Sequence, residues 1–363
     1  MSEDFVRDSI HRLRPYVPGK PIEEVERELG ITDIIKMASN ENALGPSPRA
    51  IEAMRRALND VALYPDGSCF SLRLAVAKHC DVEPDNLIFG NGSDDIIHMI
   101  GLTFLRDEDE CVQGDVTFSQ YETCAVLNNS CCRMAPVKDF TYDVDAMARL
   151  VNEKTKLIFI ANPNNPTGTM VAHDEVQRLL DRLPERCVLV MDEAYYEYVE
   201  RDDYPRSIEW VKQGRNVIVL RTFSKVYALA GLRVGYGIAR REIIKYVERV
   251  REPFNVNSVA MAGAIASLED PEQVARSRAF NSAGKRYLYA EFDRMGLKYS
   301  PTEANFIWVD VKTDSVQVFK QLLRRGVIVR TGDIFSAPTH IRVTIGTEEQ
   351  NRRFINALTE VLA

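Results

Sequence analysis

The chain has 363 residues, of which 45% are hydrophobic and 27% are charged, and its net charge is −7. This composition is typical of a folded globular protein, and the lack of a basic block argues against nucleic-acid binding. The apolar runs are far shorter than the ~20 residues that cross a bilayer, and the acidic N-terminus lacks a signal-peptide core. Seven cysteines without a Cys-x-x-Cys pair do not indicate a disulfide framework, and the five histidines lack metal-ligand spacing. We therefore expect a cytoplasmic protein without a metal site, built from one large and one small domain.

The first clear helix signal begins at Ser47-Pro48, because serine is a favoured N-cap and proline suits the first helical position. The apolar residues that follow recur on one helical face. This helix precedes the expected strands, so we assign residues 1–60 to an N-terminal arm and part of the small domain.

The middle of the chain alternates short apolar runs with helix-like segments, which is typical of an α/β fold. Continuous apolar runs predict strands buried on both faces, as in a mostly parallel sheet. Expected strands are 87–89, 157–161, 187–191 and 217–220, with helices near 93–105, 143–152 and 173–182. A further strand is expected at 131–135, where Cys131 and Cys132 would act as small hydrophobic residues. We expect residues 61–265 to form the large domain.

The pattern changes after about residue 270. A long charged helix is predicted at 272–295, followed by an alternating strand at 305–309 and strands at 327–329 and 341–345. The last residues place apolar side chains on one face of a final helix. We expect residues 266–363 to form a small α+β domain.

Polar segments follow the expected strands, where the active sites of open α/β sheets lie. The run 90–95, Gly-Asn-Gly-Ser-Asp-Asp, leads into a helix, and such an N-terminus suits a phosphate. The run 162–168, Asn-Pro-Asn-Asn-Pro-Thr-Gly, has turn composition. Each run alone is equally compatible with an ordinary turn.

Two ionisable residues follow the next two strands. Asp192 comes directly after five apolar residues, so its carboxylate needs a cation or a hydrogen-bond donor, although a helix cap would also explain it. Lys225 follows the strand at 217–220 and is either a surface charge or an amine that forms imines with carbonyl groups. The four features meet at one sheet edge, and together they favour an active site.

These segments resemble the fold-type I pyridoxal-phosphate enzymes of the aspartate aminotransferase superfamily, and above all the histidinol-phosphate aminotransferase family. The superfamily motifs are Asn-Pro-Thr-Gly at 165–168, Asp-Glu-Ala-Tyr at 192–195, and Ser-Lys at 224–225 with Gly-Leu-Arg at 231–233. The segments Ser-Asn-Glu-Asn at 39–42 and Tyr-Pro-Asp-Gly at 64–67 narrow the resemblance to the subgroup. It covers nearly the whole chain in order.

The resemblance implies how pyridoxal 5′-phosphate is bound. Lys225 would carry it as a Schiff base, Asp192 would pair with the pyridine nitrogen, and Tyr195 and Asn165 would hydrogen-bond the ring oxygen. Phe118 would stack on the ring, although Asp115-Val116 stands where the family usually has prolines. The residues expected around the phosphate are Gly92, Ser93, Asp94, Thr222, Ser224 and Arg233, with Tyr64 from the second subunit of a homodimer.

The resemblance also implies an amino transfer between L-histidinol phosphate and 2-oxoglutarate. Arg342 would receive a substrate anion, and Tyr16, Asn42 and Arg330 would line the same pocket. Arginine accepts phosphate or carboxylate in the same bidentate geometry, so one pocket can serve both substrates. An aromatic amino acid aminotransferase and a phosphothreonine decarboxylase-like lyase remain the alternatives within this class. A non-catalytic module that keeps the fold is the alternative from another class.

Overall fold

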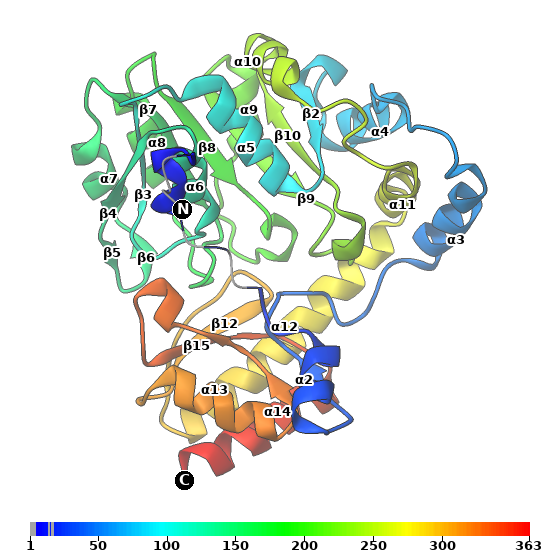
Figure 1. Ribbon diagram of the computed structural model, residues 1–363, viewed down its shortest axis with the longest axis vertical. Helices are drawn as coiled ribbons and strands as arrows, with labels where there is room; N and C mark the ends of the chain where they lie inside the picture. Colours follow the sequence, from blue (N-terminus) through cyan, green and yellow to red (C-terminus); the bar gives the residue numbers. More distant parts are fainter. Residues whose placement is uncertain (1–4, 14, 16–17) are drawn as a thin grey trace.

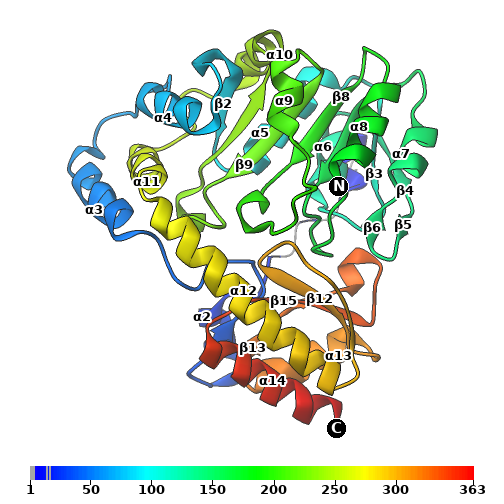
Figure 2. The ribbon, with the colours of Figure 1, turned by 180° about the vertical axis from the view of Figure 1, so that it is seen from behind.

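Two α/β bodies joined by a long helix make up the chain (Figure 1). The computed structural model describes residues 5–13, 15 and 18–363. The large body is the seven-stranded sheet with helices α3 to α11, and the small body is the four-stranded sheet with α2, α13 and α14. Helix α12 (Pro271–Arg294) runs from beside α11 in the large body to the small body, as Figure 2 shows most clearly.

The sheet of the large body is mostly parallel, as the apolar runs predict. Its strand order is β2-β10-β9-β8-β7-β3-β4, and only β10 runs antiparallel to its neighbours. The strands are β2 Leu87–Gly90, β3 Glu110–Gly114, β4 Cys131–Ala135, β7 Thr155–Ala161, β8 Val188–Asp192, β9 Val217–Thr222 and β10 Gly235–Ala239. The sequence predicts all of them except β3 and β10.

Helices cover both faces of this sheet, so its central strands are buried on both sides, whereas the edge strand β4 is largely exposed. In β7, Ile158 and Ile160 pack in one apolar cluster while Leu157 and Phe159 pack in the other, and all four side chains are fully buried. The helices before α12 are α1 Asp8–His11, α2 Ile22–Leu29, α3 Pro48–Ala57, α4 Phe70–Cys80, α5 Ser93–Phe104, α6 Gln120–Leu127, α7 Val144–Leu150, α8 His173–Arg182, α9 Ser207–Lys212, α10 Arg241–Val247 and α11 Ser258–Leu268. The predicted N-cap of α3 is confirmed, because the Ser47 hydroxyl accepts a hydrogen bond from Arg49 N at 3.2 Å.

The small body has an antiparallel sheet in the order β11-β12-β15-β14. Its elements are β11 Lys298–Ser300, β12 Phe306–Asp310, α13 Ser315–Arg324, β14 Arg330–Thr331, β15 His340–Thr344 and α14 Glu348–Leu362. Strand β1 (Ile35–Lys36) pairs with β13 (Val327–Ile328) and so ties the N-terminal segment to this body. The expected alternation in β12 is wrong: its first four residues are all buried, because aromatic rings cover the face that carries Trp308.

One expectation about the cysteines needs correction. Cys132, expected to be a free thiol, is bonded to Cys111. The register of β3 and β4 places the two residues directly opposite each other, with their Cα atoms 4.8 Å apart. Because the sequence does not predict β3, it does not predict this pair either.

The division at residues 60 and 265 stays a prediction, and residue 265 lies within α11. Across the described part of the chain, no helix combines the length and apolar composition needed to span a membrane.

Candidate active site

The carboxyl ends of β2, β7, β8 and β9 meet segments of the small body around a cleft of about 240 Å³. Residues from both bodies line it, which explains why they are far apart in the sequence. The predicted residues that line the cleft are Ser93, Asp94, Phe118, Asn165, Asp192, Tyr195, Thr222, Ser224, Lys225, Arg233, Arg330 and Arg342.

Asp192 is the buried acid of the cleft, at the last position of β8. The Tyr121 hydroxyl donates a hydrogen bond to Asp192 Oδ2 at 2.7 Å, and Ala194 N donates to Oδ1 at 3.2 Å. Burial nevertheless raises the pKa of Asp192 to about 6. A nearby cation would stabilise the charged form of this carboxylate.

Lys225 follows β9 and lies between the two bodies. Its Nζ donates a hydrogen bond to the Ser39 carbonyl oxygen at 3.4 Å and lies 5.5 Å from the centre of the Tyr195 ring. Asn40, next to Ser39, donates from Nδ2 to the Tyr195 hydroxyl at 2.9 Å. The amine and the phenol are therefore held in one corner of the cleft.

The N-terminus of α5 lies at the other end of the cleft. Gly92 precedes the helix at φ 86°, and a side chain there would collide with the Arg233 guanidinium. Arg233 Nη2 lies 3.8 Å from Asp94 Oδ2, and Arg233 Nη1 donates to the Ser224 hydroxyl at 3.4 Å. The Thr222 hydroxyl donates to Ser224 Oγ at 3.0 Å. Free N–H groups, hydroxyls and a guanidinium suit a phosphate dianion.

Two arginines of the small body close the cleft. Arg330 on β14 and Arg342 on β15 are directly paired in the sheet register. Arg342 donates to Asn165 Oδ1 and, at 2.6 Å, to the Ala38 carbonyl oxygen. These contacts fix the Arg342 guanidinium at the junction of the two bodies.

Several predicted residues lie elsewhere. Asn42 is turned away from the cleft, because its Nδ2 donates to the Val226 carbonyl oxygen at 2.8 Å and to Ser277 Oγ at 2.9 Å. Tyr16 lies outside the described residues. Tyr64 is 83% exposed and stacks on Phe254 with the ring centres 4.8 Å apart, so it does not line the cleft of its own chain.

The sequence reasoning missed Tyr121, Ser39 and Asn40, all of which line the cleft. Tyr121 lies in α6, three residues after Phe118, and its ring contacts Phe118 edge-on and stacks on Phe159. A helical tyrosine near a sheet edge carries no distinctive signal. For Asn40 the signal was present, because it belongs to the same segment as Asn42.

An ion pair lies on the opposite side of the end of β8. Glu193, the residue after Asp192, accepts hydrogen bonds from Arg221 Nε at 3.0 Å and Nη2 at 2.8 Å. Both side chains are buried, and the Arg221 guanidinium lies 3.8 Å from the centre of the Tyr196 ring. This pair does not line the cleft.

Comparisons with known proteins agree with this geometry. The family model "Aminotransferase class I and II" matches residues 32–358. The histidinol-phosphate aminotransferase of Moorella thermoacetica is 53% identical, over 98% of this chain and 93% of its own length. That of Caldicellulosiruptor saccharolyticus is 46% identical, over 98% of this chain and 99% of its own.

A solved structure is also similar to this chain. It is the histidinol-phosphate aminotransferase of Sinorhizobium meliloti in complex with pyridoxal 5′-phosphate. It superposes with a TM-score of 0.92 at 26% identity, covering 100% of this chain and 98% of the other. The chain therefore belongs to the class I and II aminotransferases and, within them, to the histidinol-phosphate aminotransferase family.

Proposed function

We propose that the cleft binds pyridoxal 5′-phosphate through Lys225 and Asp192, with its phosphate at the N-terminus of α5. The enzyme is an aminotransferase that uses this coenzyme to exchange an amino group between L-histidinol phosphate and 2-oxoglutarate. The observation that carries the residue assignment is that an amine, a buried acid and an anion-binding helix end line one cleft.

The donors of the cleft fit the coenzyme. A buried carboxylate with a raised pKa is stabilised by a cation, and the protonated ring nitrogen is such a cation. The α5 terminus, Ser224 and Arg233 suit a phosphate group. Lys225 supplies the amine that can form an imine with an aldehyde.

The coenzyme, when bound, withdraws electrons from the substrate carbon that bears the amino group. Asp192 would hold the proton on the ring nitrogen, because opposite charges ~4 Å apart attract by roughly 4 kcal/mol at an effective dielectric of about 20. The Lys225 amine would act as the general base that takes the proton from that substrate carbon. Tyr195 and Asn165 would hydrogen-bond the ring oxygen.

Arg330 and Arg342 would bind the anionic end of either substrate. Two arginines at paired positions of the sheet, both lining the cleft, can hold the phosphate of histidinol phosphate in one half-reaction and a carboxylate of glutamate in the other. The ring of an aromatic amino acid needs no such charge compensation, whereas burying an unpaired phosphate dianion would be costly. The arginine pair therefore favours the phosphorylated substrate.

The substrate assignment is tested by kcat/KM for histidinol phosphate, phenylalanine and tyrosine with one oxo-acid acceptor. We expect histidinol phosphate to lead, and we expect Arg342→Lys to lower its value more than the value for phenylalanine. If phenylalanine matches or exceeds histidinol phosphate, the substrate is wrong while amino transfer stands. Carbon dioxide released from phosphothreonine would overturn the reaction type as well.

The cleft is shared, in our proposal, between the two chains of a homodimer. Tyr64 stands among exposed apolar side chains on the surface of the large body, an arrangement that favours burial by a partner. The exposed neighbours are Leu58, Val61, Leu63 and Phe70. Tyr64 would then donate its hydroxyl to the phosphate bound by the second chain.

Mixed dimers test this sharing. We expect that combining Lys225→Ala with Tyr64→Phe raises activity above that of either variant, because one site of each hybrid keeps both residues. Activity is measured at limiting coenzyme, after subunit exchange has been verified. Exchange without recovery would contradict a shared site. A cytoplasmic location stays a prediction.

A further inference from the structure

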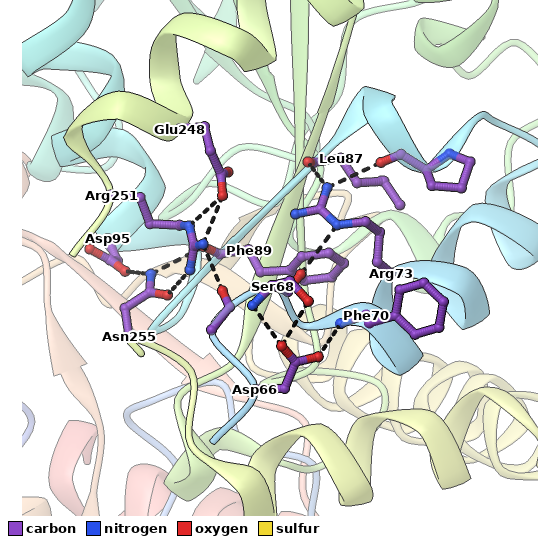
Figure 3. Close-up of polar contacts among 12 residues, drawn as sticks. Asp66, Ser68, Phe70, Arg73, Leu87, Phe89, Asp95, Glu248, Arg251 and Asn255 are labelled. Carbon is purple, nitrogen blue, oxygen red and sulfur yellow. Dashed lines mark hydrogen bonds and ion pairs between the residues drawn. The ribbon is translucent and has the colours of Figure 1, made fainter. Parts of the chain in front are cut away.

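A partly buried polar network connects the loop that carries Tyr64 with the N-terminus of α5 (Figure 3). Its centre is the segment 251–255, between the 3-10 turn at Glu248–Val250 and helix α11. The network contacts two groups of one chain to which the proposed function assigns coenzyme phosphate: the α5 N-terminus, which serves the site of the same chain, and Tyr64, which serves the site of the partner chain. No residue of the segment itself lines the cleft.

Arg251 holds the Tyr64 loop. Its Nη2 donates to the Gly67 carbonyl oxygen at 2.7 Å, and its side chain is only 12% exposed. Glu248 orients the guanidinium by accepting from Nε at 2.9 Å and from Nη2 at 2.7 Å. The neighbouring Phe254 stacks on Tyr64, so the segment contacts this loop twice.

Asn255 holds the phosphate corner of its own chain. Its Nδ2 donates to Asp95 Oδ2 at 2.8 Å and to the Phe89 carbonyl oxygen at 3.1 Å. The same Asp95 oxygen accepts a hydrogen bond from Asn91 N at 2.8 Å, which shapes the turn before Gly92. Arg251 Nη1 donates to Asn255 Oδ1 at 2.9 Å and completes the connection.

We propose that Arg251 and Asn255 form a clamp that positions the phosphate-binding groups of both active sites, Asn255 for its own chain and Arg251 for the partner chain. The proposal rests on the proposed sharing of Tyr64. The two residues act as positioning residues, because neither contacts the coenzyme. Arg251 should therefore act on the opposite site of the dimer, whereas a residue that merely supports its own fold would act on its own site.

Hybrid dimers with a single competent lysine separate these two effects. In the first hybrid, Arg251→Lys is on the chain that keeps Lys225, and the other chain carries Lys225→Ala. In the second, Arg251→Lys is on the Lys225→Ala chain, which supplies Tyr64 to the competent site. The measurement is the dissociation constant of pyridoxal 5′-phosphate, followed by the visible absorbance of the lysine-bound coenzyme.

We expect about tenfold weaker coenzyme binding in the second hybrid and less than a twofold change in the first, because one charge-assisted contact to the phosphate is lost. Asn255→Asp should give the reverse, since it sets a carboxylate against Asp95 in its own chain. Arg249→Lys is the matched control: Arg249 lies on the outer face, over the Tyr246 ring, and should change neither hybrid. Equal effects of Arg251→Lys in both hybrids, or an effect only in the first, would overturn the clamp.

Two further variants keep the result interpretable. Gly67→Ala perturbs the same loop through its other contact with the segment, because a Cβ there would lie 3.3 Å from the Phe254 ring, and it should reproduce the second-hybrid defect if Arg251→Lys does not fold. Tyr64→Phe is measured in both hybrids. If Tyr64→Phe weakens only the first hybrid, the shared site itself is wrong. If Tyr64→Phe weakens coenzyme binding only in the second hybrid and Arg251→Lys weakens it in neither, the shared site stands and the clamp is wrong.

Discussion

Asp192 and Glu193 are consecutive carboxylates at the end of β8, and they lie in opposite kinds of environment. Glu193 has a buried arginine within hydrogen-bond distance. Asp192 has a tyrosine hydroxyl and a backbone N–H, and among the described residues it forms no ion pair with a lysine or arginine. Asp192 lines the cleft, whereas Glu193 does not. The protein itself therefore supplies the cation that pairs with Glu193, whereas Asp192 is suited to pair with a cation of the coenzyme.

The sharpest test of this difference is Asp192→Asn. We expect kcat to fall by about 10³, because a loss of roughly 4 kcal/mol lowers the ring pKa by ~3 units. The coenzyme should remain bound through Lys225, which visible absorbance would verify. Near-normal kcat would remove the carboxylate from the mechanism.

Glu193→Gln should have the opposite effect to Asp192→Asn: it should lower stability and leave kcat nearly unchanged. It leaves the Arg221 charge buried without its partner, so the free energy of unfolding should fall by about 3 kcal/mol. Denaturant unfolding measures that loss, and kcat per folded molecule should stay within about threefold of the wild type. A loss of kcat as large as that of Asp192→Asn would show that the two acids are not functionally distinct.

The raised pKa of Asp192 predicts a pH dependence of coenzyme binding. Affinity for pyridoxal 5′-phosphate should fall about tenfold per unit below pH 6, because Asp192 must lose its proton to pair with the ring nitrogen. In the coenzyme-free protein the folded state holds the extra proton between pH 3.8 and about 6, so stability falls as the pH rises through that window. Titration of Asp192→Asn is the control, and an unchanged slope there would assign the effect to another group.

Tyr121→Phe should have the smallest effect. Removing the hydroxyl takes away one hydrogen bond to Asp192, which costs about 1 kcal/mol and should lower kcat three- to tenfold. The pKa of Asp192 should rise further, so the loss of coenzyme affinity should begin at a higher pH. A Tyr121→Phe enzyme with the wild-type pH profile would show that the Tyr121 hydroxyl does not stabilise the charged form of Asp192.

The sequence predicts those features for which a residue type in its context permits few structural interpretations. Lys225 comes shortly after the buried strand β9, and Asp192 is the last residue of the buried strand β8. An unpaired charge at such a position is energetically unfavourable, so it stands out in the sequence as a candidate functional residue. Strand β10, with the sequence Gly-Tyr-Gly-Ile-Ala, has too few apolar residues to form a run, and β3 contains Glu110 and Gln113. Tertiary packing alone identifies both strands.

Prediction of the site residues from sequence has a similar limit, because the sequence does not show which way each side chain points. The resemblance places Asn42 in the pocket, but Asn40 of the same segment lines the cleft instead, because which asparagine faces the cleft depends on the backbone, and Asn40 has a left-handed φ of 58°. Asn42 is turned toward Val226 and Ser277 instead. Motif spacing does not encode that rotation.

Helix α12 gives the molecule a mechanical property. Its 24 residues span ~36 Å, with Ser277 near the cleft and Leu288 and Phe292 in the core of the small body. A rigid rod of that length acts as a lever, and a tilt of about 5° would move its far end by roughly 3 Å. Small adjustments beside Val226, the residue after Lys225, would thus be amplified into a visible displacement of the arginine-bearing sheet.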